Sequence, residues 1–478
     1  MGCPGAAGGD TAHQHGGSRG RGRRPRRGTG RDHAQPLPRE VRAVTMPDWV
    51  THAIWWQIYP LGFVGAHPAD PPPGPEEHRL RRIVEWLDHA VELGASGLAL
   101  GPVFASRTHG YDTTDHLRID PRLGDDADFD HVVAEAHRRG LRVLLDGVFN
   151  HVGTDFARYR QALGGDADSA AWFRHRDGKF EVFEGHGELI ALNHDNPEVV
   201  NYTAGVMRHW LGRGADGWRL DAAYAVPDRF WAQVLPIVRS DFGDAWFVGE
   251  VIHGDYAATV AASTFDSVTQ YELWKAVWSA LNDGNFHELD WALQRHNDFL
   301  ASFVPMTFVG NHDVTRIASQ LSDARHLEHA LVILFTTGGI PSVYAGDEWG
   351  HQGVKEERRG GDDAVRPEFG ERPGPDAPGA DVLRLHQYLI GLRRRHPWLH
   401  SATTTPLLLT NTQYVYRSAG AAGALVVALN LDDAPLRVAL PELGLASGVV
   451  VAGSKAPPQE QIEVTEVPPH GWLVIEPR

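Results

Sequence analysis

The sequence predicts an α/β fold, in which short parallel strands alternate with helices, followed by a small all-β domain. Strand-length apolar runs alternate with helical stretches between about residues 54 and 396. Four of these runs end on acidic residues or histidines, which is typical of strands that deliver their side chains to one shared mouth. After about residue 400 the chain holds only short strand-like runs separated by turns.

The eight expected strands are short and apolar. They cover residues 54–59, 96–100, 141–148, 217–221, 246–251, about 267–272, 304–311 and 340–345. Helices are expected at residues 76–93, 128–139, 197–213 and 379–396, and Gly94 and Gly140 are expected to end the first two. This order fits a (β/α)8 TIM barrel. A doubly wound open sheet is the alternative, but it usually carries a glycine-rich phosphate turn after an early strand, and the sequence has none.

The barrel is expected in two parts, residues 46–151 and 196–399, on either side of an insertion at residues 152–195. The insertion lacks the pattern of a clear helix or a long strand. It follows the third strand on the side where loops build barrel active sites. Residues 400–478 are expected to form an all-β sandwich.

Residues 1–45 hold nine Arg and three acidic residues with almost no large apolar side chains, so a disordered basic tail is expected. Met46 is the expected biological start. The whole chain carries a net charge of -16, which argues against nucleic acid as a partner. No run of 18 apolar residues is present, so no membrane span is expected. The single cysteine, Cys3, excludes an internal disulfide and fits a cytoplasmic location. The oligomeric state is left open, with a dimer as one possibility.

The fourth expected strand ends in Gly217-Trp-Arg-Leu-Asp221. Side chains alternate along a strand, so Arg219 and Asp221 should share one face. We expect Arg219 to keep Asp221 ionised and to lower its pKa. An ionised carboxylate in a pocket is a candidate nucleophile, whereas a structural ion pair is the alternative for this segment taken alone.

Three further strand ends carry similar groups: Asp146-Gly-Val-Phe-Asn-His151, Gly249-Glu250, and Phe308-Val-Gly-Asn-His-Asp313. Together with the segment that ends at Asp221, this series resembles the α-amylase family of glycoside hydrolases. The residue patterns around Glu250 and at residues 271–275 most resemble the cyclomaltodextrinase and neopullulanase group of that family. The resemblance covers roughly residues 50–478 and implies the same barrel, the insertion known as domain B, and the C-terminal β domain.

The resemblance assigns the catalytic roles. Asp221 matches the nucleophile, Glu250 the general acid/base, and Asp313 the acid that binds sugar hydroxyls and stabilises the transition state. Retaining hydrolysis needs one carboxylate that attacks and one carboxylic acid that protonates the leaving oxygen. The resemblance also implies a substrate-binding set that consists of Tyr111, Asp112, Asp146, His151, Arg219, His312 and Arg316. Tyr111 would stack on the glucose ring, Asp146 would order the pocket, and the two histidines would bind hydroxyl groups.

The sequence departs from the family pattern at Tyr224 and Ala225, where many amylases have Lys-His. In those amylases the histidine backbone helps to hold calcium, for which Asn150 resembles another ligand. We therefore expect no metal and no cofactor, with calcium as the alternative. The predicted function is retaining hydrolysis of α-1,4 bonds, with α-1,6 bonds as an addition, in short or cyclic malto-oligosaccharides. Transglycosylation or isomerisation of α-glucosides and a non-catalytic sugar-binding barrel are the alternatives.

Overall fold

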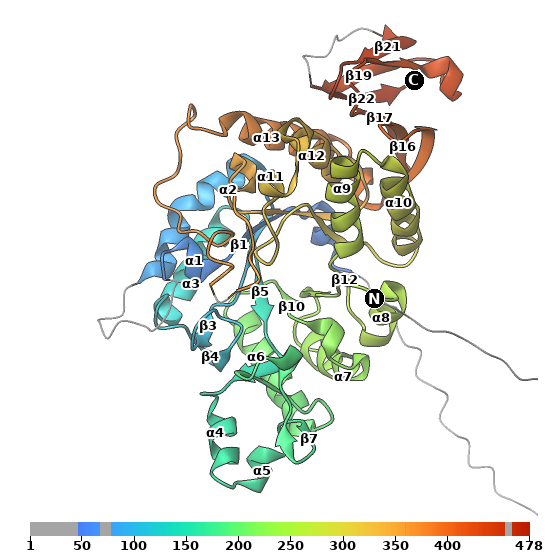
Figure 1. Cartoon of the computed structure of the whole chain (residues 1–478). Coiled ribbons are helices and arrows are strands. Elements are labelled where there is room, and N and C mark those ends of the chain that lie inside the picture. Colours follow the sequence, from blue (N-terminus) through green and yellow to red (C-terminus); the bar gives the residue numbers. More distant parts are fainter. Residues whose placement is uncertain (1–45, 67–77, 359, 455–460) are drawn as a thin grey trace, which may run out of the picture. The chain divides into compact units, whose positions relative to one another are not determined.

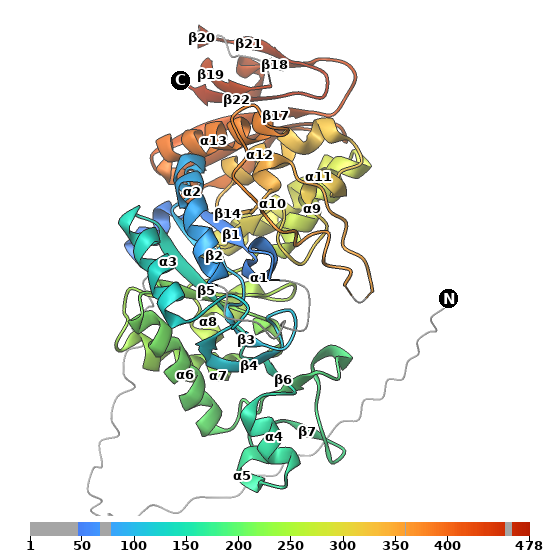
Figure 2. The same ribbon diagram turned by 90° about the vertical axis from the view of Figure 1, so that its left-hand side faces the viewer.

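A computed structural model describes residues 46–66, 78–358, 360–454 and 461–478 (Figures 1 and 2). The predicted tail at residues 1–45 lies outside the described residues. Within the described part of the chain, no helix is long and apolar enough to cross a membrane.

Eight parallel strands form the centre of the fold. They are β1 (Trp55–Ile58), β2 (Gly97–Leu100), β5 (Arg142–Gly147), β10 (Gly217–Leu220), β11 (Trp246–Gly249), β12 (Ser267–Val268), β13 (Met306–Phe308) and β14 (Ile340–Tyr344). Their order in the sheet is β12-β11-β10-β5-β2-β1-β14-β13. A parallel bridge between Thr269 and Met306 joins the two outermost strands. The sheet is therefore a nearly closed barrel, and the predicted (β/α)8 fold is confirmed.

Helices surround this barrel in Figures 1 and 2. The longer ones are α2 (Leu87–Leu93), α3 (Asp126–Arg138), α6 (Pro197–Gly212), α7 (Asp228–Arg239), α8 (Tyr256–Ser263), α9 (Tyr271–Asp283), α10 (Phe286–Leu300), α12 (Leu327–Thr336) and α13 (Ala380–Arg395), and the short ones are α1 (Pro60–Phe63) and α11 (Ile317–Gln320). The expected helix at 76–93 is a 3₁₀ helix, η2 (Arg79–Trp86), followed by α2, and its first two positions lie outside the described residues. Gly94 ends α2 with a φ of 93°.

The sixth strand is shorter than predicted. It ends at Val268, and α9 begins at Tyr271, so the expected strand at 267–272 is wrong over its last residues. The Gln270 side chain accepts a hydrogen bond from the backbone N–H of Leu273 and caps the helix. A local side-chain cap of this kind favours the start of a helix over continuation of the strand.

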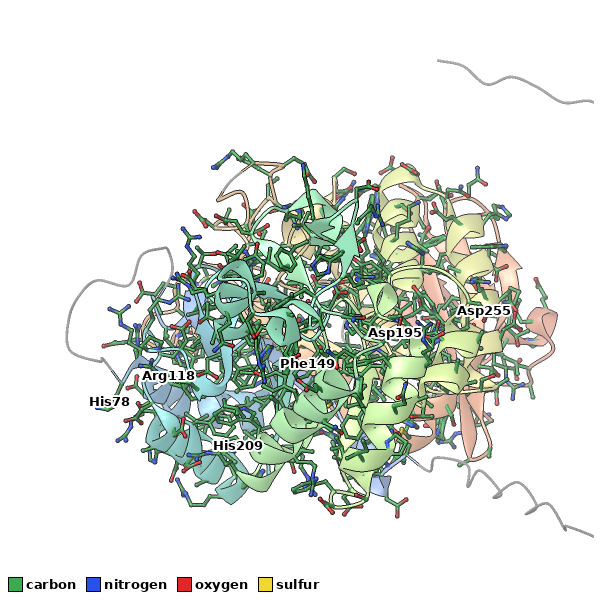
Figure 3. All side chains as sticks on the ribbon, turned by 90° about the horizontal axis from the view of Figure 1, so that it is seen from below. His78, Arg118, Phe149, Asp195, His209 and Asp255 are labelled. Carbon is green, nitrogen blue, oxygen red and sulfur yellow. The ribbon has the colours of Figure 1, made fainter. Side chains whose placement is uncertain are left out.

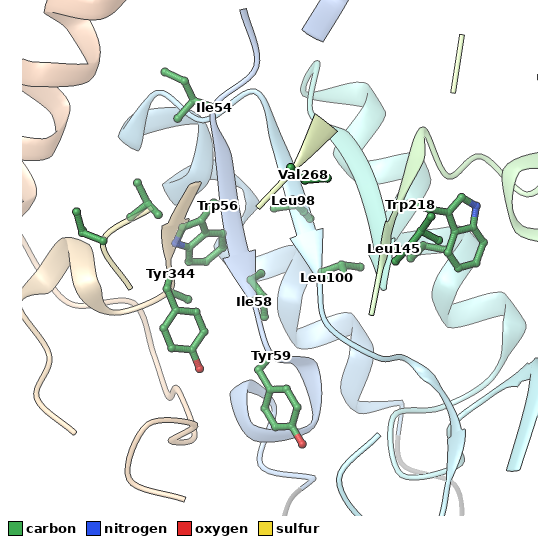
Figure 4. Close-up of a cluster of buried hydrophobic side chains, with 14 of the residues drawn as sticks. Ile54, Trp56, Ile58, Tyr59, Leu98, Leu100, Leu145, Trp218, Val268 and Tyr344 are labelled. Carbon is green, nitrogen blue, oxygen red and sulfur yellow. The ribbon is translucent and has the colours of Figure 1, made fainter. Parts of the chain in front are cut away.

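Alternation along the barrel strands separates two apolar layers. Trp55 and Trp246 point into the barrel, where their rings stack with centroids 5.6 Å apart. The neighbouring side chains point outward and belong to the large core shared with the helices, as Figure 4 shows for Trp56, Leu98 and Trp218. The inner apolar layer fills one end of the barrel and leaves the other end to polar side chains.

The insertion after β5 contains more helix than its sequence suggested. It holds α4 (Ala157–Leu163), α5 (Ala167–Ala170), the 3₁₀ turn η3 (Phe183–Gly185), and the short strands β6 (His151–Gly153), β7 (His175–Arg176), β8 (Lys179–Phe180) and β9 (Leu189–Ala191). The insertion leaves and rejoins the barrel at one place, because His194 Nε2 lies 3.0 Å from the Phe149 carbonyl oxygen. Figure 3, seen from below, labels Phe149 and Asp195 toward the middle of the view.

The C-terminal domain is all β. Its six-stranded sheet has the order β15-β16-β17-β22-β19-β20, and β18 pairs with β21 in a separate ladder. These strands are β15 (Thr403–Leu409), β16 (Gln413–Gly420), β17 (Gly423–Asn430), β18 (Leu436–Ala439), β19 (Gly448–Gly453), β20 (Gln461–Ile462), β21 (Val464–Val467) and β22 (Trp472–Pro477). Val438 and Val467 of the ladder pack against Val426 and Ile475 of the larger sheet, which gives two layers with a common core.

Candidate active site

The polar end of the barrel collects the side chains that follow β5, β10, β11 and β13. The register pairs Arg219 with Asp146 on one side and with Val248 on the other. Asp221 and Glu250 come one position past the ends of their strands. Because parallel strands present their carboxyl ends at the same rim, residues far apart in sequence meet here.

Arg219 connects three carboxylates. Its Nη1 donates to both oxygens of Asp146, at 2.7 and 2.6 Å, and to Asp221 Oδ1 at 3.3 Å. Its Nη2 lies 2.5 Å from Glu250 Oε1. The Arg219 side chain is only 7% exposed, so these charge-assisted contacts form with little solvent screening. Asp221 and Glu250 are consequently brought to one guanidinium.

Glu250 has two further donors. The backbone N–H of Ala222 donates to Oε2 at 2.8 Å, and the Tyr271 hydroxyl donates to Oε1 at 3.1 Å. Ala222 adopts a φ of 45°, which turns its N–H toward Glu250 directly after the Asp221 carboxylate. Asn311 Nδ2 in turn donates to the Tyr271 hydroxyl at 2.9 Å. The Glu250 carboxyl is therefore held from several sides.

Asp313 lies between His312, which the sequence predicted as a binding residue, and Arg366, which it did not. Its Oδ2 is 3.0 Å from His312 Nε2, and its Oδ1 accepts from Arg366 Nη2 at 2.7 Å. Arg366 Nε also donates to the His312 carbonyl at 2.9 Å. Arg366 follows β14 in an irregular loop, where neither periodicity nor a strand end marks it. Only an excess of acids at the site could have suggested a second guanidinium.

Aromatic rings line one wall of the site. The Tyr111 and Tyr59 rings both lie nearly parallel to the His312 ring, with centroids 5.6 and 5.9 Å away. The Tyr111 hydroxyl donates to Asp146 Oδ2 at 3.0 Å and also contacts His312 Nε2. Gln57 Nε2 holds the other ring nitrogen of His312 at 3.2 Å. Tyr59 and Gln57 were missed because the first strand carries no acidic residue at its end.

His151 is fixed on the side of the insertion. Its Nε2 lies 3.0 Å from the Tyr111 carbonyl oxygen, and its ring stacks on Phe183 with centroids 4.8 Å apart. Burial lowers the pKa of His151 to about 3, so the imidazole is neutral in the folded protein. Tyr224 donates to Glu184 Oε1 at 2.7 Å, so η3 of the insertion closes over the loop that follows β10.

The charges at the site do not follow the sequence expectation in one respect. Burial and the adjacent Glu250 carboxylate raise the pKa of Asp221 well above its ordinary value, although Arg219 opposes this. Arg219 lowers the Asp221 pKa, as expected, but burial and Glu250 outweigh it, so the net shift is opposite to the expected one. His312 and Arg366 hold the pKa of Asp313 well below its ordinary value. The cluster thus keeps Asp313 ionised and favours a proton on Asp221.

Comparison with known proteins decides the family. A profile of the alpha amylase catalytic domain matches residues 57–377. The chain belongs to the alpha-amylase family.

The relatives of this alpha-amylase family member include two named enzymes. Neopullulanase 2 of Thermoactinomyces vulgaris is 32% identical over 73% of this chain. The matched region spans 64% of that relative, which is less than two thirds of its length. A cyclomaltodextrinase of Bacillus sp. is 30% identical over 84% of this chain and 76% of the relative. The ligand-free structure of the cyclic alpha-maltosyl-(1→6)-maltose hydrolase from Arthrobacter globiformis superposes with a TM-score of 0.75 at 26% identity, and covers 90% of this chain and 99% of that one.

Two predicted binding residues of this family member form none of the described hydrogen bonds to Asp221, Glu250 or Asp313. Asp112 accepts hydrogen bonds from the backbone N–H and the hydroxyl of Thr108, at 3.1 and 2.7 Å, and organises the loop that carries Tyr111. Arg316 is fully buried. Its Nη1 donates to Asp347 at 2.7 Å and to the Ala345 carbonyl at 3.0 Å. The structure therefore places Arg316 as a support for the loop after β14.

Calcium can be tested against Asn150. Its Oδ1 is buried and has no hydrogen-bond partner among the described residues, while its Nδ2 lies 3.1 Å from His151 Nδ1. A calcium ion takes six to eight oxygen ligands, so one free amide oxygen supplies a small part of a site. The absence of a required metal stays a prediction.

Proposed function

We propose that the protein is a retaining glycoside hydrolase that cleaves α-glucosidic bonds, mainly α-1,4, in short or cyclic malto-oligosaccharides. The observation that carries this proposal is the convergence of Asp221 and Glu250 on the Arg219 guanidinium, at 3.3 and 2.5 Å. Two carboxyl groups that contact the same guanidinium are close enough for the double displacement that retaining enzymes use. The family and the names of its relatives agree with this reaction class.

In the first step, the Asp221 carboxylate attacks the anomeric carbon while the bond to the leaving oxygen breaks. Glu250 gives its proton to that oxygen, and the sugar stays bound to Asp221 as an ester. In the second step, Glu250 takes a proton from water, which attacks the anomeric carbon and releases Asp221. Two inversions leave the product with the α configuration of the substrate. Asp313, kept ionised by Arg366 and His312, is suited to bind sugar hydroxyls and to stabilise positive charge at the transition state.

The free site must move one proton before it reacts. Burial and the adjacent Glu250 raise the pKa of Asp221, which favours a proton on Asp221 in the free site. The reaction needs the opposite distribution. We infer that this proton leaves Asp221 when the sugar binds, so that the Asp221 carboxylate can attack.

The proposed preference for small substrates rests on the wall formed by the insertion. Glu184 and Phe183 meet Tyr224 and His151 at the mouth, which limits the space beyond the cleaved bond. Tyr224 also stands where many amylases carry a lysine that serves a distant subsite. Fewer remote contacts leave less binding energy for long glucans.

The Asp221→Asn variant tests the mechanism. The amide cannot form the ester intermediate, so turnover of maltotriose should fall at least roughly ten-thousandfold. Asp228→Asn, at the first residue of α7, is the matched control and should retain activity. Proton NMR of the first product from the unchanged enzyme should show the α anomer. Near-normal turnover by Asp221→Asn, or an initial β anomer, would contradict the proposal.

A substrate panel tests the specificity. We expect the specificity constants for maltotriose and a cyclodextrin to exceed that for soluble starch, counted per bond. Pullulan and isomaltose report on α-1,6 bonds, and glucose release measured beside total bond cleavage separates hydrolysis from transfer. Starch cleavage much faster than cleavage of both small substrates would refute the proposed preference.

We also propose a cytoplasmic location. The proposal is supported by the single cysteine of the chain and by a relative named intracellular maltogenic amylase from Bacillus subtilis, which is 28% identical over 66% of this chain. Cell fractionation with a cytoplasmic marker enzyme measures the location, and recovery outside the cytoplasmic fraction would refute it.

A further inference from the structure

Two histidines, His326 and His470, meet where the barrel contacts the C-terminal domain. His326 ends the 3₁₀ turn η5 (Ala324–His326) before α12, and His470 lies in the turn between β21 and β22. His326 Nε2 is 3.1 Å from His470 Nδ1. Asp323 Oδ2 lies 4.0 Å from His326 Nε2. One nitrogen or oxygen atom from each of the three residues falls within 4.8 Å of the others.

The tautomer of His470 follows from its second contact. His470 Nε2 is 2.9 Å from Asp433 Oδ1. An ionised carboxylate only accepts hydrogen bonds, so Nε2 of His470 carries the hydrogen. In the neutral ring, Nδ1 then carries no hydrogen, and its lone pair points toward His326. Metal-binding histidines show this pattern, in which a carboxylate fixes the ring and the other nitrogen faces the ion.

The spacing suits a tetrahedral ion. Two imidazole nitrogens at roughly 2.0–2.1 Å from a tetrahedral Zn²⁺ lie about 3.3–3.4 Å apart, close to the 3.1 Å between His326 and His470. Asp323 needs a small side-chain rotation to join them. Its Oδ2 also accepts from Arg325 Nη2 at 2.6 Å, but a carboxylate oxygen has more than one acceptor site. The side chains of His326, His470 and Asp323 are 9%, 12% and 29% exposed, which leaves access for water.

A second group of possible ligands in the described part of the chain is less suitable. It consists of His78, Asp125 and Asp128. Asp128 is already occupied, because it accepts from Arg81 Nε at 2.5 Å and from the backbone N–H of Asp125 at 3.0 Å. This group also offers only one imidazole, whereas the first offers two, and imidazole nitrogen is the ligand that suits Zn²⁺.

We propose that Asp323, His326 and His470 bind one divalent transition-metal ion such as Zn²⁺, with water as the fourth ligand and Asp433 as the group that orients His470. Two imidazoles and one carboxylate suit Zn²⁺, whereas Ca²⁺ prefers oxygen ligands alone. The ion joins η5 to the turn between β21 and β22, beside His329, whose Nε2 lies 3.0 Å from the Gly471 carbonyl oxygen. Its role is to stabilise the contact between the barrel and the C-terminal domain.

Isothermal titration calorimetry tests the site on the full chain, with any affinity tag removed and after dialysis against EDTA and then metal-free buffer. ZnCl₂ is the titrant, and His470→Asn is the main variant, because asparagine tolerates the φ of 49° at this position. His287→Asn, an exposed histidine on α10, is the matched control. We expect the unchanged protein and the control to bind one Zn²⁺ more than His470→Asn does. Asp433→Asn should weaken that binding about 10- to 100-fold.

Thermal melting gives a second readout. Zn²⁺ should raise the melting temperature of the unchanged protein and of His287→Asn, but not that of His470→Asn, because ligand binding to the folded state stabilises it. Maltotriose hydrolysis and near-UV circular dichroism report whether each variant folds. If His470→Asn does not fold, Asp323→Asn replaces it in both measurements. Equal Zn²⁺ stoichiometry, affinity and thermal shift in the unchanged protein and the ligand variant would overturn the proposal and leave an ordinary hydrogen bond between the two histidines.

Discussion

Arg219 Nη1 lies closer to both oxygens of Asp146, to which it donates at 2.7 and 2.6 Å, than to Asp221 Oδ1 at 3.3 Å. Asp146 therefore fixes the position of the guanidinium that the two reacting carboxyls share. Neither oxygen of Asp146 needs to touch the sugar for this residue to matter. Its effect on the reaction should pass through Arg219.

Replacing Asp146 with asparagine should lower kcat for maltotriose roughly a hundredfold and change KM little, because a displaced Arg219 misplaces Asp221 and Glu250. Steady-state kinetics give both constants. Asp290→Asn, on α10, is the matched control and should behave like the unchanged enzyme, since Asp290 accepts from the Tyr414 hydroxyl at 2.8 Å and from Gln294 Nε2 at 3.3 Å, neither of which contacts the catalytic acids. A rise in KM with an unchanged kcat would show instead that Asp146 binds substrate directly.

Removing the Tyr271 hydroxyl should lower kcat about tenfold or more, because Glu250 then loses one of its hydrogen bonds. The Tyr271→Phe variant should keep its fold and melting temperature. Tyr416→Phe in the C-terminal sheet removes a hydroxyl that contacts only Thr336 at 2.7 Å, and it serves as the control. Equal kcat values for the two variants would mean that the Tyr271 hydroxyl does not position Glu250.

Shortening Glu184 should change substrate choice more than turnover. Glu184→Ala frees the Tyr224 hydroxyl and loosens the closure of η3 over the mouth. We expect the specificity constant for soluble starch, relative to that for maltotriose, to rise about fivefold, since an exposed polar contact is worth up to about 1 kcal/mol. Glu188→Ala in the same insertion is the control. An unchanged ratio would show that this wall does not set specificity.

The buried His116 should make the folded protein less stable in acid. Burial lowers its pKa to about 4 in the folded protein, against roughly 6.5 in an unfolded chain. The unfolded state therefore binds more protons between these values, so the stabilising effect is complete above pH 6.5 and is lost as the pH falls toward 4. From pH 7 to pH 5 this one residue should cost about 2 kcal/mol of unfolding free energy.

Urea unfolding of the unchanged protein and of His116→Gln at pH 7 and pH 5 measures that loss. The variant should be less stable at pH 7, because His116 Nε2 lies 2.7 Å from the Val148 carbonyl oxygen. Its loss of stability between the two pH values should nevertheless be smaller by about 2 kcal/mol. The same pH dependence in both proteins would show that His116 is protonated in the folded state.

Chelation tests the prediction that no calcium is required. We expect EGTA to leave kcat/KM for maltotriose within about twofold, because one unpartnered oxygen at Asn150 falls short of the six to eight oxygens of a calcium site. Added CaCl₂ should not change the rate. A rate that falls with EGTA and returns with calcium would establish the alternative.

The sequence by itself determined the barrel and the strand ends that carry Asp221 and Glu250. Alternation along a strand is a local property, so Arg219 and Asp221 could be placed on one face from their spacing alone. Apolar runs of strand length set the positions of β5, β10 and β11, and their carboxyl ends had to share one rim once the strands were parallel. The helix expected at 197–213 could be predicted from its apolar periodicity and from Pro197 at its first turn.

Tertiary structure decided which partners meet. The pKa of Asp221 depends on burial and on Glu250, and Arg366 reaches Asp313 from a loop that no local pattern marks. His326 and His470 are separated by 144 residues, and only packing of the C-terminal domain brings them to 3.1 Å. Local sequence patterns report backbone preference and the face of a side chain, whereas desolvation and charge pairing arise from groups that folding brings together from distant parts of the chain.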